Sequence, residues 1–232
     1  QERKNLLKTC YKIIFNSSWS KKRFLEGLEN KFVNSDKLLI FHQSASKGSF
    51  NLLNKKEKWI TFVGKLNKAK GYDVFASSIK KILNKYPDWK AKIIGDEKRE
   101  KISLNHNRAH ILGFKKHDEV LSIFRKTSIA VACSRWEEPF GRTSLEASAN
   151  GCAVIITNKG GLPETVTDAK ILKRLNVTEL TSTINFLIKN NNLRKKLQNL
   201  SIRNFYLTHS YVAAAIDNYR SEKISYLKKI NT

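Results

Sequence analysis

The strongest constraint on the fold is a regular alternation of apolar runs and amphipathic segments from residue 59 onward. Each apolar run is nearly continuous, which is typical of strands buried on both faces of a parallel sheet. The expected strands are residues 59–63, 91–94, 110–112, 129–133 and 153–157. Apolar residues between these runs recur at helical spacing, so the pattern predicts an α/β fold in which a doubly wound parallel sheet carries helices on both faces.

Each expected strand is followed by a glycine or a polar residue. These residues are Gly64, Gly95, Gly113, Ser134 and Asn158. Because ligands of such sheets bind outside the carboxyl ends of the strands, we expect the five loops to converge on one crevice. The sequence holds neither GxxxxGK(S/T) nor GxGxxG, so the phosphate loop of an NTPase and an ordinary dinucleotide-binding domain have little support.

The N-terminal region is less regular. Residues 12–18 predict a short buried strand that ends in polar turn residues, and a second apolar run covers residues 38–41. Residues 19–28 have the spacing of a helix, with Ser18 or Ser20 as its N-terminal cap. The region therefore predicts a strand and a helix, followed by a second apolar run.

Two further regions carry no strand signal. Residues 43–54 are rich in Ser, Gly and Asn, and we expect them to form a loop at a domain boundary. From Val177 to the end, the apolar spacing predicts three helices, the last beginning at about Tyr211. The C-terminal part is thus expected to be entirely helical.

The charge balance is strongly positive, with 44 Lys and Arg against 20 Asp and Glu, or +24 at pH 7. Such a field attracts polyanions, so nucleic acid, an anionic membrane surface and a phosphorylated substrate are all candidate partners. The basic residues are spread over the whole chain, and the sequence shows no nucleic-acid-binding motif. No nucleic-acid partner is therefore expected.

The cysteines and histidines point away from disulfides and metals. Cys10, Cys133 and Cys152 show no CxxC spacing, which disfavours a disulfide scaffold and a zinc ribbon and favours a reducing cytoplasm. His106 and His110 are close in sequence, but nothing nearby completes a ligand set, and no metal is expected. No apolar run approaches the ~20 residues that a membrane span requires.

The most informative segment lies between Ser134 and Ala147. Pro139 and Gly141 interrupt a continuous helix, so Glu138 is expected in a loop and Glu146 in the first turns of the following helix. The N-terminus of that helix would offer free N–H groups and a positive dipole end to a phosphate.

An alternative for the same segment is that Thr143 and Glu146 form a capping box that satisfies those N–H groups. Taken alone, the segment favours the capping box over the phosphate site. The order of motifs along the whole chain reverses this preference.

Several motifs occur in a fixed order. They are Phe62-Val63-Gly64-Lys65-Leu66, Lys70-Gly71, Ile94-Gly95-Asp96, Leu112-Gly113, Glu138-Pro139-Phe140-Gly141, Glu146-Ala147 and Gly160-Gly161-Leu162-Pro163-Glu164. This order resembles the C-terminal domain of retaining GT-B glycosyltransferases of the family 4 type, over residues 58 to 165. The signature of that family is two glutamates separated by seven residues, a spacing that Glu138 and Glu146 share.

The resemblance implies roles for the two glutamates and for the backbone near them. Glu146 would accept hydrogen bonds from the ribose hydroxyls of a nucleotide-sugar, and Glu138 would lie by the hydroxyls of the donor sugar. The backbone at Phe140 and Gly141 would face the sugar and the diphosphate. Arg142 stands where an aliphatic residue is common, and it would either reach the diphosphate or be solvated.

The resemblance also implies a phosphate site without a metal. Lys65, next to Gly64, and Lys70 would hold the diphosphate as it leaves, and with Glu138 they are the expected catalytic residues. The segment at Leu112 and Gly113 would line the base. No cofactor is expected, since the UDP- or GDP-linked sugar is a substrate.

By the same resemblance the chain divides into four parts. Residues 1–31 would be the last strand and helix of an N-terminal acceptor domain, and residues 32–57 the linker and domain boundary. Residues 58–209 would bind the donor, and residues 210–232 would form a helix that crosses back toward the N-terminal domain. Because most of an acceptor domain is missing from this sequence, the chain alone is expected to be inactive.

The expected function is transfer of a hexose from a nucleotide-sugar to a glycan or lipid-linked acceptor with retention, in cell-surface polysaccharide or lipopolysaccharide biosynthesis. The expected location is the cytoplasm, where the positive surface would hold the protein on an anionic membrane. Two alternatives remain. A GT-B sugar-nucleotide epimerase would bind the same donor, and a basic nucleic-acid-binding module would rest on the net charge alone.

Overall fold

The computed structural model describes residues 2–29 and 36–230. The chain divides into two compact units. The larger unit comprises residues 47–205, and the smaller one combines the residues up to 46 with those from 206 onward. The beginning of the expected linker, residues 32–35, lies outside the described part.

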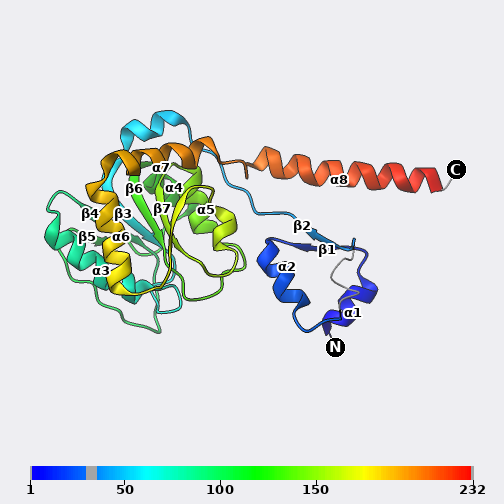
Figure 1. The fold of residues 1–232 in the computed structure, drawn as a ribbon, viewed down its shortest axis with the longest axis horizontal. Coiled ribbons are helices and arrows are strands. Elements are labelled where there is room, and N and C mark those ends of the chain that lie inside the picture. Colours follow the sequence, from blue (N-terminus) through cyan, green and yellow to red (C-terminus); the bar gives the residue numbers. More distant parts are fainter. Residues whose placement is uncertain (1, 30–35, 231–232) are drawn as a thin grey trace. The chain divides into compact units, whose positions relative to one another are not determined.

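The larger unit is built on a six-stranded parallel sheet with the order β5-β4-β3-β6-β7-β8 (Figure 1). Its strands are β3 (Glu57–Val63), β4 (Lys90–Ile94), β5 (Ala109–Ile111), β6 (Thr127–Ala132), β7 (Ala153–Thr157) and β8 (Ala169–Leu172). The first five coincide closely with the expected strands. The chain order reverses between β3 and β6, and a reversal of this kind marks where doubly wound sheets bind ligands.

Helices cover both faces of this sheet, so the expected doubly wound α/β fold is confirmed (Figure 1). They are α3 (Tyr72–Lys85), α4 (His117–Lys126), α5 (Arg142–Ala149), α6 (Val177–Lys189) and α7 (Asn191–Arg203). Alternate residues of β6 enter different cores. Ile129 and Val131 pack with apolar residues of α3 and α6, whereas Ala130 packs with those of α4 and α5.

The sequence did not indicate three short elements of the larger unit. These are β8, the 3-10 helix η2 (Phe50–Lys55) within the expected loop, and the 3-10 helix η3 (Leu162–Thr165). Strand β8 lies at the edge of the sheet, and only its last residue, Leu172, is buried. An edge strand of four residues with one buried side chain lacks the continuous apolar run that revealed the other strands.

The smaller unit contains α1 (Glu2–Thr9), β1 (Ile13–Phe15), α2 (Ser18–Leu25), β2 (Leu38–Ile40) and α8 (His209–Ile230). Strands β1 and β2 pair in parallel. The cap of α2 was assigned to the wrong serine, because Ser17 rather than Ser18 or Ser20 is the N-cap. The Ser17 hydroxyl oxygen accepts from the Ser20 backbone N–H at 2.9 Å. Helix α1 was not expected, since its sequence is mostly polar.

Lys56 joins the C-terminal ends of two helices in the larger unit. Its Nζ donates to the Phe124 carbonyl oxygen of α4 at 3.0 Å and to the carbonyl oxygen of Asn150, the C-cap of α5, at 2.6 Å. Burial lowers the pKa of Lys56. The carbonyl groups at helix ends lack intrahelical donors and carry the negative end of the dipole, so a buried cation there satisfies both helices at once.

We therefore expect Lys56→Met to destabilise the protein. The variant keeps the apolar stem but removes a donor from two carbonyl groups of buried residues. The Phe124 oxygen keeps the Thr127 N–H and the Cys152 thiol, so the cost of about 1–3 kcal/mol in the free energy of unfolding comes mainly from the Asn150 carbonyl group. Urea titration followed by circular dichroism measures the loss. The control is Lys58→Met, because the Lys58 side chain is exposed in its ion pair with Asp88 and contributes about 0–1 kcal/mol. Equal stability of the two variants would contradict the double capping role.

Candidate active site

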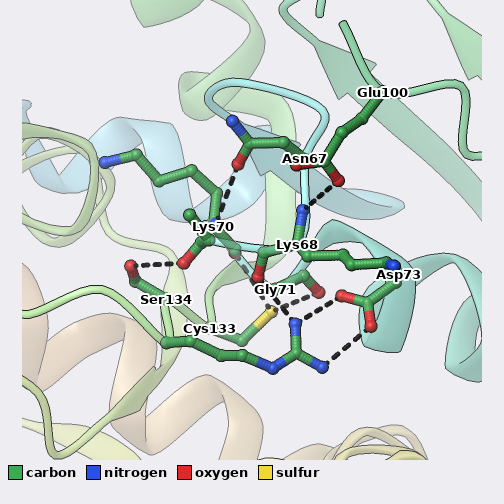
Figure 2. A network of polar contacts seen from close by, with 10 residues as sticks. Asn67, Lys68, Lys70, Gly71, Asp73, Glu100, Cys133 and Ser134 are labelled. Atoms are coloured by element: carbon green, nitrogen blue, oxygen red, sulfur yellow. Dashed lines mark hydrogen bonds and ion pairs between the residues drawn. The ribbon is translucent and has the colours of Figure 1, made fainter.

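The loops that follow β3 and β6 are joined by backbone contacts where the strand order reverses. Figure 2 shows Lys70 and Gly71 beside Cys133 and Ser134. Gly71 has a φ of 73°, and a Cβ atom there would lie 2.0 Å from the Cys133 carbonyl oxygen. Only glycine fits so close an approach at this φ. The Ser134 hydroxyl also donates to the Ala69 carbonyl oxygen at 3.1 Å, so the two loops are fixed to each other.

Cys133 lies beneath this junction. Its Sγ is 3.5 Å from the Gly71 carbonyl oxygen, and its side chain is fully buried. Burial raises the pKa of the Cys133 thiol to about 12. Because the reactive form of cysteine is the thiolate, Cys133 is a packing residue of the junction and not a nucleophile.

Lys70 and Glu138, expected respectively at the diphosphate and at the donor sugar, form an ion pair through Lys70 Nζ and Glu138 Oε1. The Glu138 side chain is 14% exposed and that of Lys70 is 32% exposed. On the other side, the Gly161 N–H donates to the Glu138 carbonyl oxygen at 2.7 Å. Gly160, at φ 59°, allows this contact, because a Cβ there would lie 2.1 Å from the same oxygen. The structure thus brings together two of the three expected catalytic residues.

A second ion pair spans the same two loops. Arg135 Nη1 and Nη2 donate to Asp73 Oδ1 and Oδ2 at 2.6 and 2.8 Å, the two-bond geometry that arginine makes with carboxylates. Burial opposes ionisation of Asp73, but the hydrogen bonds from Arg135 outweigh it and lower the pKa of that carboxyl. Neither residue was singled out in the sequence. Their positions, shortly after β6 and in the first turn of α3, are the only signal that could have found them.

Glu146 is the buried carboxylate of the site, with 7% of its surface exposed. Its Oε1 accepts hydrogen bonds from Arg142 Nε at 3.2 Å, Arg142 Nη2 at 3.0 Å and His117 Nε2 at 3.0 Å. Among the residues that the structure describes, no hydrogen bond reaches Oε2. The described residues therefore hold the Glu146 carboxylate through one of its two oxygens.

The capping-box alternative for Glu146 is wrong. The N-cap of α5 is Gly141, at φ 111°, and it makes no side-chain cap hydrogen bond. Thr143 is inside the helix, one residue after its start, so it cannot be the cap. The first turn of α5 therefore keeps backbone N–H groups without intrahelical acceptors, as a phosphate site requires.

The sequence did not predict that Arg142 and His117 contact Glu146. Arg142 was expected either at a diphosphate or in solvent, yet its guanidinium contacts Glu146 while its side chain stays 58% exposed. His117, the first residue of α4, was missed. The signal that could have found it is its place four residues after Gly113, where the loop that leaves the carboxyl edge of the sheet enters α4.

The glycine ends of β3, β4 and β5 are connected to one another. The Gly64 N–H donates to the Ile94 carbonyl oxygen at 3.0 Å, and the Gly95 N–H donates to that of Gly113 at 2.8 Å. Leu112 is half-buried and packs on the core beneath α4 and α5. The three strand ends thus form a continuous edge, and the loop that begins at Gly113 leads from this edge to His117.

Two expected site residues take up different environments. Lys65 is exposed on the loop after β3. Phe140 is 2% exposed, so its side chain belongs to the core and only its backbone can face a ligand. Among the described residues there is no group of three or more His, Cys, Asp and Glu side chains that could hold a metal ion. Within the same residues, no helix is long and apolar enough to cross a membrane.

Comparison with known proteins identifies the family. The family described as "Glycosyl transferases group 1" matches residues 46–203. An uncharacterised glycosyltransferase of Methanocaldococcus jannaschii is 34% identical over 199 residues, which cover 80% of this chain and 52% of that protein. The lipopolysaccharide core biosynthesis mannosyltransferase LpsB of Rhizobium meliloti is 31% identical over 125 residues, which cover 50% of this chain and 35% of that protein. This chain thus spans about half of the first relative and about a third of the second.

Solved structures agree with this assignment. HepE of Anabaena, in complex with UDP and glucose, has a TM-score of 0.78 at 17% identity over 95% of this chain and 66% of that one. The C-terminal domain of a glycosyl transferase group 1 family protein from Francisella tularensis has a TM-score of 0.58 at 25% identity over 68% of this chain and 92% of that one. Fold and family match together show that this chain belongs to the group 1 glycosyl transferases and has the GT-B type of fold.

Proposed function

We propose that this chain binds the nucleotide-sugar donor of a retaining, metal-independent glycosyltransferase at the carboxyl edge of its sheet. The observation that carries the proposal is the Lys70–Glu138 ion pair at the reversal of strand order. It places a cation that suits a diphosphate against a carboxylate that suits sugar hydroxyls. The HepE structures with UDP and with UDP-glucose, which share this fold, support a donor of this chemical class.

The diphosphate would be held by three positive groups. These are the ammonium groups of Lys65 and Lys70 and the N-terminus of α5 at Gly141. Negative charge grows on the diphosphate as the sugar leaves, and fixed positive groups that meet this charge stabilise the transition state without a metal. Phe140 and Gly141 contribute backbone only, which allows close approach of the sugar and the phosphates.

The nucleoside would lie between Glu146 and the β5 edge. The free Oε2 of Glu146 would accept from a ribose hydroxyl, while Arg142 and His117 keep the carboxylate in place through Oε1. The backbone at Leu112 and Gly113 would border the base. In this arrangement Arg142 contributes to the nucleoside site by positioning Glu146 and not by binding phosphate.

The acceptor is proposed to be a glycan or a lipid-linked sugar. LpsB acts in lipopolysaccharide core biosynthesis, and a further relative is an uncharacterised protein of a cps region in Klebsiella pneumoniae. The net charge of +24 would hold the protein at the cytoplasmic face of an anionic membrane. The epimerase alternative is not favoured, because the family and the named relatives are glycosyltransferases.

Calorimetric titration of the 232-residue chain with UDP, GDP and their glucose and mannose derivatives tests the donor site. We expect one nucleoside diphosphate and its sugar derivative to bind without added metal, and binding to survive a chelator. A folded chain that binds neither nucleotide would refute the proposed function.

Glu146→Ala should weaken the nucleoside diphosphate and the nucleotide-sugar alike, since both contain the ribose. A hydrogen bond to a charged group contributes roughly 1.5–3 kcal/mol, so the expected loss is about ten- to a hundred-fold in Kd. Titration calorimetry of both ligands measures it, and a thermal melt confirms the fold. Glu137→Ala removes an exposed carboxylate close to the site and should change neither affinity. Unchanged binding by folded Glu146→Ala would end the ribose assignment.

Glu138→Gln should separate the two ligands. The change removes the negative partner of Lys70, so the free ammonium should bind UDP or GDP about fivefold tighter, the equivalent of about 1 kcal/mol. The intact nucleotide-sugar should gain less or lose affinity, because the carboxylate that receives its hydroxyls is gone. Competition binding with a fluorescent nucleotide measures both affinities, with Glu137→Gln as the matched control. Equal changes for both ligands would contradict the placement of Glu138 at the sugar.

A further inference from the structure

Two ion pairs connect the loop after β3 with the loop after β6. The inner pair is Lys70–Glu138, and the outer pair is Asp73–Arg135. Figure 2 shows Lys70, Gly71 and Asp73 close together where the first loop enters α3. The inner pair lies in the proposed donor site, whereas the proposed function assigns no ligand contact to either residue of the outer pair.

The contacts of Arg135 surround Lys70 in the sequence. Its Nη1 donates to the Lys68 carbonyl oxygen at 2.6 Å, and its backbone N–H donates to that of Ala69 at 2.9 Å. Both terminal nitrogens of the guanidinium also reach Asp73. Arg135 is therefore bonded to residues on either side of Lys70, and both terminal nitrogens of its guanidinium are already engaged by the protein.

A diphosphate that binds the Lys70 ammonium competes with Glu138 for the three N–H donors of that group. The inner pair is therefore the connection between the two loops that donor binding weakens, as the Lys70 side chain turns from Glu138 toward the ligand. Flexible lysines lose side-chain entropy on binding, and a backbone that is already fixed adds no further ordering cost. The Arg135 side chain is then the charged connection that remains between the loops, beside the contacts of Ser134 and Cys133, and it helps to keep the backbone of Lys70 where the phosphate needs it.

We propose that Arg135, held by Asp73, is a positioning residue for donor binding that keeps the Lys70 loop in place while Lys70 exchanges Glu138 for the diphosphate. The proposal rests on the proposed function, since it takes the donor diphosphate as the ligand of Lys70. Two pKa shifts agree with a pair that stays closed. The pKa of Asp73 is lowered by its hydrogen bonds from Arg135 against the cost of burial, and the hydrogen bonds to Asp73 raise the pKa of Arg135.

A double-mutant cycle distinguishes this role from a general effect on folding. Kd for UDP and for GDP is measured in the 232-residue chain, in Glu138→Gln, in Arg135→Ala and in the double variant. With Arg135 present, Glu138→Gln should tighten the nucleotide about fivefold, because the freed Lys70 is still in position. Arg135→Ala alone should weaken it about tenfold, and in that background the gain from Glu138→Gln should disappear.

Two further variants sharpen the cycle. Arg135→Lys keeps a positive charge near Asp73 but lacks the planar fork, so it should restore part of the affinity and part of the gain. If Arg135→Ala fails to fold, Arg135→Lys and Asp73→Asn carry the same cycle. Lys58→Ala breaks an exposed ion pair that begins on β3, far along the strand from its carboxyl end, and should leave the gain from Glu138→Gln intact.

The outcomes separate the two proposals. A wild-type chain that is folded but binds neither UDP nor GDP overturns the proposed function and this inference with it. Glu138→Gln could raise the nucleotide affinity by the same factor with Arg135 present and in the Arg135→Ala background. That result would overturn the positioning role of Arg135 but not the proposed function. The positioning role is supported if Glu138→Gln no longer raises the nucleotide affinity in Arg135 variants whose melting temperature is unchanged, but still raises it in Lys58→Ala.

Discussion

The site depends on how closely two backbone segments approach each other at the reversal of strand order. Gly71 and the Cys133 carbonyl group lie so near that no side chain fits between them. This contact fixes the start of α3 against the end of β6, and every proposed phosphate and sugar contact from these two loops follows from it. Because the two backbone segments lie so close together, charged side chains of one loop reach those of the other and form the Lys70–Glu138 and Asp73–Arg135 ion pairs.

Charge in the site is balanced, although the chain as a whole is strongly basic. Each site carboxylate has a cationic partner: Lys70 for Glu138, and Arg142 for Glu146. Lys65 is exposed, and it adds positive charge where the diphosphate is proposed to bind. Since the net charge of +24 is not concentrated in these pairs, most of the excess lies elsewhere on the surface. The proposed donor site therefore accounts for only a small part of the positive charge.

Local sequence was enough to predict the parts of this structure that depend on local chemistry. Continuous apolar runs predicted five of the six strands of the main sheet, and ordered motifs singled out Glu138 and Glu146. The edge strand β8 escaped because it buries a single residue. The Arg135–Asp73 pair and the contact of His117 with Glu146 join residues 62 and 29 positions apart, and no spacing rule reaches so far. The sequence thus indicated the residues that are expected to contact a ligand. It did not indicate the residues that hold those side chains and loops in position.

The buried thiol at the loop junction has a practical consequence. Cys133 cannot be alkylated while the junction is closed, because it is fully buried and its pKa is about 12. Cys152 is equally buried but belongs to the core on the opposite face of the sheet. Any local separation of the two loops exposes the first thiol and leaves the second covered. When a thiol reagent is added and the labelled peptides are separated from that of the less buried Cys10, the ratio of the two labelling rates therefore reports opening of the junction, with Cys152 as the internal standard.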